Sequence, residues 1–193
     1  MNMEKEDPSA CLHGDVFLFS AGFPDDALDV VAGVHSFFKK TGLKLSVAES
    51  CTGGLIGHYI TQLPGASCFF EAGVISYSER AKEKVLHVPE EVVRASGLVS
   101  EETAREMARG AMELLGSDFA LSTTGNLGPD ALEGKAVGLV YVGVCSKRRA
   151  GDPGQKPVCQ TKKMLLKGGR DENKKEAALE ALRFLLEQAR NRS

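Results

Sequence analysis

The run Ala48-Glu49-Ser50-Cys51-Thr52-Gly53-Gly54 decides the fold, because it joins a predicted strand to a predicted helix. Residues 43–48 alternate like a strand with one buried face, and apolar residues recur at helical spacing from Leu55 to Leu63. Ser50 and Thr52 therefore lie on the connecting turn, where Gly53 and Gly54 allow close approach of a ligand to the backbone. Unpaired N–H groups at the helix start would favour a phosphate or an oxyanion there. A capped helix after a glycine-rich turn explains the same pattern without a ligand.

The rest of the chain alternates between predicted helices and strands. Further helices are predicted over 25–42, 78–86, 89–93, 100–116 and 171–190, and further strands over 69–77, 119–123, 137–144 and 158–166, the last at a sheet edge because of Lys162 and Lys163. This alternation predicts an α/β domain over residues 26–193, with functional side chains at the strand ends. Residues 1–25 are interpreted as an N-terminal extension.

Composition excludes several classes of function. The 193 residues carry a net charge of -2 and no basic cluster beside aromatic residues, so neither nucleic acid nor a membrane is an expected partner. No apolar run reaches the ~18 residues of a membrane span, and the acidic start is unlike a signal peptide. Five cysteines without a Cys-x-x-Cys pair argue against a disulfide framework and a thiolate metal site. We therefore expect a reduced cytoplasmic protein without a structural metal or a cofactor.

Reactive side chains gather at the junctions between elements. They are Ser50, Thr52, Tyr77, Ser78, Lys82, Thr124 and Arg170. No histidine lies near them in the sequence, so the alternative base for a serine nucleophile is Lys82, whose pKa would fall on desolvation. Arg170, just before the last helix, could hold a phosphate through its planar fork. Each residue also has an ordinary structural explanation, such as a solvated Lys82 or a strand-end Tyr77.

Taken together, these signals match a family. The segments that carry the match are 48–54, Gly73-Val74-Ile75-Ser76-Tyr77-Ser78-Glu79-Arg80-Ala81-Lys82, Gly97-Leu98-Val99-Ser100-Glu101-Glu102, Thr124-Gly125-Asn126-Leu127-Gly128-Pro129 and Ala136-Val137-Gly138-Leu139-Val140-Tyr141. Residues 26–190 resemble the CinA C-terminal domain, the nicotinamide-nucleotide amidohydrolases that deamidate nicotinamide mononucleotide. The resemblance implies a three-layer α/β/α sandwich with a mixed, mostly parallel sheet, no metal, and a homodimer or higher homo-oligomer.

The resemblance also implies roles for individual residues. Ser50 would be the nucleophile, Lys82 its base, and Tyr77 a further catalytic group. The groups around a small nucleotide substrate would be Thr52, Gly53, Gly54, Ser78, Thr124, Gly125 and Arg170. Two segments depart from the family pattern, Gly125-Asn126-Leu127-Gly128-Pro129-Asp130 and Lys135-Ala136-Val137-Gly138.

Two alternatives follow from the sequence. The altered loop at Asn126–Asp130 fits a regulatory nucleotide-binding protein with weak catalysis on the same fold. Cys51, next to Ser50, is a second candidate nucleophile, or else a buried structural thiol.

Overall fold

The computed structural model describes residues 27–148 and 157–192. The proposed extension at 1–25, and with it the predicted helix start at Asp25-Asp26, lies outside these residues. A five-stranded sheet has the order β2-β1-β3-β4-β5. Its strands are β1 (Leu45–Glu49), β2 (Phe70–Ile75), β3 (Phe119–Gly125), β4 (Leu139–Ser146) and β5 (Val158–Leu165).

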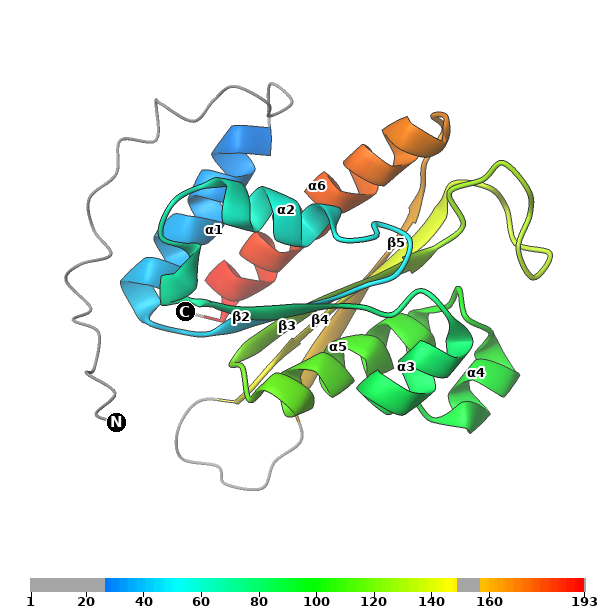
Figure 1. Cartoon of the computed structure of the whole chain (residues 1–193), viewed down its shortest axis with the longest axis horizontal. Coiled ribbons are helices and arrows are strands. Elements are labelled where there is room, and N and C mark those ends of the chain that lie inside the picture. Colours follow the sequence, from blue (N-terminus) through cyan, green and yellow to red (C-terminus); the bar gives the residue numbers. More distant parts are fainter. Residues whose placement is uncertain (1–26, 149–156, 193) are drawn as a thin grey trace, which may run out of the picture.

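Helices cover both faces of this sheet (Figure 1). On one face lie α1 (Ala27–Thr41), α2 (Leu55–Gln62) and α6 (Arg170–Asn191), with the short 3₁₀ helix η3 (Ala66–Cys68) before β2. On the other face lie α3 (Glu79–Leu86), α4 (Glu90–Ser96) and α5 (Glu101–Leu115). The α/β class and the predicted order of elements are confirmed. In the described residues, no helix has both the length and the apolar composition needed to cross a membrane.

The central strand β1 is more deeply buried than its sequence pattern predicts. All five of its residues are buried, so the expectation of a single buried face is wrong. The reason is that β1 pairs with a strand on each side and has helices over both faces. Strand β5 does lie at an edge of the sheet, as its lysines predict.

The sheet is mixed, and half of its pairings are antiparallel. β1 runs parallel to β2 and β3, whereas β4 runs antiparallel to both β3 and β5. Four of the five strands point in the same direction, and only β4 is reversed, as a mostly parallel sheet requires. The pairings are not mostly parallel, because β4 is antiparallel to both of its neighbours. One consequence decides the position of the site: β1, β2, β3 and β5 all end at the same edge of the sheet, where α/β proteins bind their ligands.

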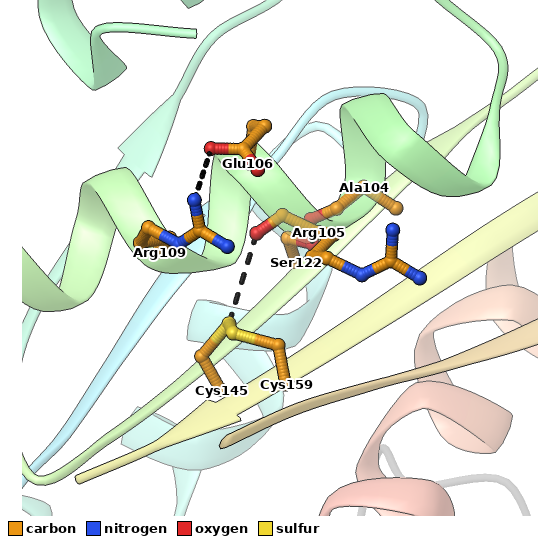
Figure 2. Close-up of a disulfide and its surroundings, with 7 residues drawn as sticks. All are labelled: Ala104, Arg105, Glu106, Arg109, Ser122, Cys145 and Cys159. Atoms are coloured by element: carbon orange, nitrogen blue, oxygen red, sulfur yellow. Dashed lines mark hydrogen bonds and ion pairs between the residues drawn. A yellow bond between two sulfur atoms is a disulfide. The ribbon is translucent and has the colours of Figure 1, made fainter. Parts of the chain in front are cut away.

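The predicted absence of disulfides is wrong. Cys145 on β4 lies directly opposite Cys159 on β5 in the register, and a disulfide joins them, with 4.0 Å between their Cα atoms. The sulfur of Cys145 also lies 3.7 Å from the carbonyl oxygen of Arg105 on α5, the helix that packs on this face of the sheet (Figure 2). An odd cysteine count does not exclude a single pair, and this pairing depends on strand register, which the spacing of cysteines does not reveal.

The packing of α5 against α3 leads to a prediction about stability. A Cβ on Gly110 of α5 would lie 1.9 Å from the carbonyl oxygen of Leu86, so Gly110→Ala forces two backbone segments apart. We expect the substitution to lower the free energy of unfolding by about 1–3 kcal/mol, measured by urea denaturation.

The matched control is Gly57→Ala on α2. A Cβ there would meet its nearest neighbour, Glu49, at an ordinary 3.6 Å. It should leave stability unchanged or raise it by up to about 1 kcal/mol. Equal stability of the two variants would contradict the tight contact between α5 and α3.

Candidate active site

A buried serine and a buried lysine meet at the edge where the strands end. Ser50 follows β1 directly, and Lys82 lies in the first turns of α3. The Lys82 Nζ atom is 2.8 Å from the Ser50 Oγ atom and 2.6 Å from the carbonyl oxygen of Ser76. Ser50 is 8% exposed and Lys82 only 1%. The distance lies within the reach required of a general base.

Local structure at the start of α3 points Lys82 inward. The hydroxyl of Ser78 accepts a hydrogen bond from the backbone N–H of Ala81 at 3.1 Å, which caps the helix. Lys82 and Leu86, four residues apart, then form its buried face. The sequence after β2 therefore places a lysine side chain inside the protein, beneath the turn that carries Ser50.

Burial changes the chemistry of this lysine. Its two hydrogen-bond partners are neutral oxygens, and in the described part of the chain it forms no ion pair with a carboxylate. Removal of the ammonium from water therefore lowers the pKa of Lys82 from its ordinary value to about 8. A lysine with this pKa is neutral in roughly a tenth of the molecules at pH 7 and in half of them at pH 8, and a neutral amine accepts a proton.

The carboxylate of Glu49 occupies the start of α2. It accepts hydrogen bonds from the N–H groups of Gly54 at 2.9 Å, Ile56 at 3.1 Å and Gly57 at 2.8 Å. The N–H of Gly53 donates to the carbonyl oxygen of Ser50 at 3.2 Å. The prediction that unpaired N–H groups at this helix start await a phosphate or an oxyanion is therefore wrong, because a protein carboxylate already caps them.

Two N–H groups of the same turn remain available. Those of Cys51 and Thr52 donate to no other residue that the structure describes. They directly follow Ser50 in the chain, whereas the N–H groups of Gly53 and Gly54 are taken. Donors for a developing oxyanion thus lie nearer to the serine than the sequence pattern indicates.

The side chains of Cys51 and Thr52 have structural contacts. The Thr52 hydroxyl is 2.8 Å from the hydroxyl of Thr123 on β3, inside the protein. Desolvation raises the pKa of the Cys51 thiol to about 12, outweighing a hydrogen bond with Thr123. Because the thiolate is the reactive form of cysteine, this environment argues against Cys51 as the nucleophile.

A cavity of about 270 Å³ opens over the serine. It is lined by Ser50, Cys51, Tyr77, residues 125–132 and Arg170. The Arg170 guanidinium donates to the Tyr77 hydroxyl at 3.0 Å and to the carbonyl oxygen of Gly128. Among the described residues, no three His, Cys, Asp or Glu side chains gather as metal ligands would.

The structure separates the predicted site residues into two groups. Ser50, Tyr77, Gly125 and Arg170 line the cavity, and Lys82 lies behind Ser50. The others do not line it: Thr52 bonds to Thr123, Thr124 donates to the carbonyl oxygen of Leu98 at 2.7 Å, Ser78 caps α3, and Gly53 and Gly54 form the turn into α2. Substrate contacts by this second group remain predictions.

The loop between β3 and β4 completes the cavity wall, and sequence reasoning did not foresee how it is held. The Asn126 amide donates to the carbonyl oxygen of Lys135 at 3.2 Å and accepts from the N–H of Gly128 at 3.1 Å. The ammonium of Lys135 donates to the carbonyl oxygens of Ser96 and Val99, each at 2.8 Å. Asn126, which departs from the family pattern, therefore connects two parts of its own loop by hydrogen bonds.

Fold and site together define an α/β protein with a mixed sheet and a buried serine–lysine pair under a small cavity. The chain belongs to the CinA family, since the model of the CinA C-terminal domain matches residues 28–189. A CinA-like protein of Geobacter sulfurreducens is 40% identical over 173 residues, which is 89% of this chain and 38% of the relative. A CinA-like protein of Chloroherpeton thalassium is 49% identical over 119 residues, 61% of this chain and 28% of the relative.

Solved structures agree with this assignment. The competence/damage-inducible protein CihA of Agrobacterium tumefaciens matches with a TM-score of 0.78 at 32% identity, covering 86% of this chain and 96% of that one. A CinA superfamily protein of Klebsiella pneumoniae also reaches 0.78, at 27% identity, covering 86% of this chain and 99% of that one. By contrast, the chain spans less than two fifths of the length of the curated relatives it matches.

Capping of α2 by Glu49 leads to a second prediction. Glu49→Gln leaves one acceptor oxygen for three N–H groups and turns an NH₂ group toward a donor. We expect the free energy of unfolding to fall by about 2 kcal/mol, measured by urea denaturation, because buried donors lose their partners.

Glu71→Gln is the control for this experiment. Glu71 is 40% exposed in its side chain and, within the described part of the chain, forms one ion pair, with the half-exposed Lys44 at 3.3 Å. Its loss should cost less than about 0.5 kcal/mol. A Glu49→Gln protein as stable as the control would contradict the role of Glu49 as the cap.

Proposed function

We propose that this protein hydrolyses the carboxamide of nicotinamide mononucleotide to a carboxylate and ammonia, with Ser50 as nucleophile and Lys82 as base. The observation that carries the proposal is the 2.8 Å distance between Lys82 Nζ and Ser50 Oγ, inside the protein and with no ion pair from Lys82 to a described carboxylate. Family membership supports the substrate, because the resemblance is to nicotinamide-nucleotide amidohydrolases.

The first step forms an ester on the serine. In its neutral form, the Lys82 amine accepts the hydroxyl proton of Ser50 as Oγ attacks the carboxamide carbon. The carbonyl oxygen of Ser76 accepts one N–H of the amine and so orients its lone pair toward Ser50. The proton on Lys82 then passes to the leaving nitrogen, and ammonia departs. Because the neutral fraction of Lys82 increases as pH rises through about 8, the rate should rise over the same range.

The tetrahedral intermediate needs donors for its oxyanion. In this proposal the N–H groups of Cys51 and Thr52 supply them, since those of Gly53 and Gly54 are occupied. One such donor is worth roughly 3 kcal/mol in the transition state. Water then attacks the ester carbon, Lys82 again removes a proton, and the carboxylate product leaves with Ser50 restored.

The cavity wall accounts for how the substrate would be held. Tyr77 and Arg170 face the cavity together, and the guanidinium keeps further N–H donors for the ribose or the phosphate. The difference from the family pattern at Asn126 motivates the alternative of a weakly catalytic binding protein. The Asn126 side chain, however, makes hydrogen bonds within the loop. This loop therefore still forms a wall over Ser50, as catalysis requires.

Replacement of the two central residues tests the mechanism. Ser50→Ala removes the nucleophile and Lys82→Met removes the base while preserving an apolar stem. Each should lower kcat for ammonia release from nicotinamide mononucleotide by at least about 10³-fold, as loss of a nucleophile or its base does in serine hydrolases.

Two further variants serve as controls. Lys84→Met changes an exposed lysine on the same helix, and Cys51→Ala removes the competing thiol. Both should keep activity within about tenfold of the parent, since neither side chain enters the proposed chemistry. Full activity of Ser50→Ala, or loss of activity only in Cys51→Ala, would overturn the proposal.

A further inference from the structure

Helix α6 carries two cations, Arg170 and Lys174, one turn apart on the face nearest the site. Residues at i and i+4 lie on the same side of a helix. Neither forms an ion pair with a carboxylate within residues 27–148 and 157–192. The neighbouring Lys175, in contrast, lies 2.6 Å from a carboxylate oxygen of Asp171. Among the described residues, the first turns of α6 therefore hold two positive charges that form no ion pair with a carboxylate.

Lys174 lies against the turn that carries the nucleophile. Its Nζ atom is 3.3 Å from the position that a Cβ on Gly53 would occupy, and its Cε atom is 3.7 Å from that position. Lys174 is partly buried, and its ammonium makes no hydrogen bond with any described residue. A lysine of this kind usually extends its ammonium into water. Here the ammonium lies beside the serine turn.

The two cations have different tasks. Two of the donors of Arg170 are engaged by neutral oxygens of Tyr77 and Gly128, so this residue also holds the cavity wall together. The cavity, at about 270 Å³, is slightly smaller than the roughly 300–1,000 Å³ of typical ligand sites. A ligand that places its amide at Ser50 and is larger than this cavity extends past the wall. A part of the ligand that lies beside Gly53 would meet the ammonium of Lys174.

We infer that Lys174 is a specificity-determining residue that binds a phosphate monoester on the substrate. The inference rests on the proposed function for the amide and adds the recognition of the anionic end. An ammonium without a counter-ion attracts a phosphate as a point charge and donates up to three hydrogen bonds to it. Lys174 takes no part in the chemical step, so its removal should weaken binding without slowing the bound complex.

The test compares substrates with and without the phosphate. Lys174→Gln, Lys174→Arg and the control Lys175→Gln are assayed on nicotinamide mononucleotide and on nicotinamide riboside, which carries the same amide. We expect Lys174→Gln to raise KM for the mononucleotide about tenfold with kcat unchanged, and to leave the riboside unaffected. Lys174→Arg should restore most of the affinity, and Lys175→Gln should behave like the parent protein.

A binding measurement separates this inference from the proposed function. Calorimetry with nicotinic acid mononucleotide and nicotinic acid riboside requires no turnover. If the parent releases no ammonia but Lys174→Gln still binds the mononucleotide about tenfold more weakly, the proposed function fails and the inference stands. Equal losses on both ligands, no loss on either, or no binding of the mononucleotide by the parent would overturn the inference.

Discussion

The site depends on one unfavourable interaction, the burial of the Lys82 amine without an ion pair to any carboxylate that the structure describes. Its contacts at 2.8 Å and 2.6 Å are to a serine hydroxyl and a backbone carbonyl, both neutral. A buried ion pair would have kept the lysine protonated and useless as a base. Desolvation instead lowers the pKa of Lys82 to about 8, and a hydroxyl within hydrogen-bond distance is the group that the neutral amine can deprotonate.

The rest of the fold holds this pair in place. Glu49 caps α2 and fixes the turn on which Ser50 lies, while Ser78 caps α3 and directs Lys82 inward. Because β1, β2, β3 and β5 end at one edge of the sheet, the segments after each of them meet there. The first turn of α6 brings Arg170 to the same place. Its guanidinium donates to Tyr77, just after β2, and to Gly128 in the β3–β4 loop, and so connects these two segments.

Local sequence patterns predicted the elements well, because periodicity changes sharply at Gly53-Gly54 and at Ser100. Contacts between distant segments were harder. The residues alone offered Lys82 as a base for a serine and left a solvated side chain open as the alternative, and the family resemblance assigned it to Ser50, 32 positions away. The Glu49 cap was missed although Glu49 adjoins the serine turn, since nothing in the sequence shows that a carboxylate at the end of a strand accepts from the N–H groups of the next helix. The Cys145–Cys159 disulfide depends on the register of β4 and β5, which the sequence does not show. The hydrogen bonds of Asn126 within its loop depend on the shape of that loop.

The most direct test of the account is the titration of Lys82 itself, followed by NMR of protein labelled at the lysine side chains, with Lys82→Met to assign the signal. The account predicts that Lys82 loses its proton near pH 8, well below the ordinary lysine pKa of about 10.4. A Lys82 signal that titrates at that ordinary value would mean that almost no neutral amine exists near neutral pH, and it would contradict the proposed role of Lys82 as the base for Ser50.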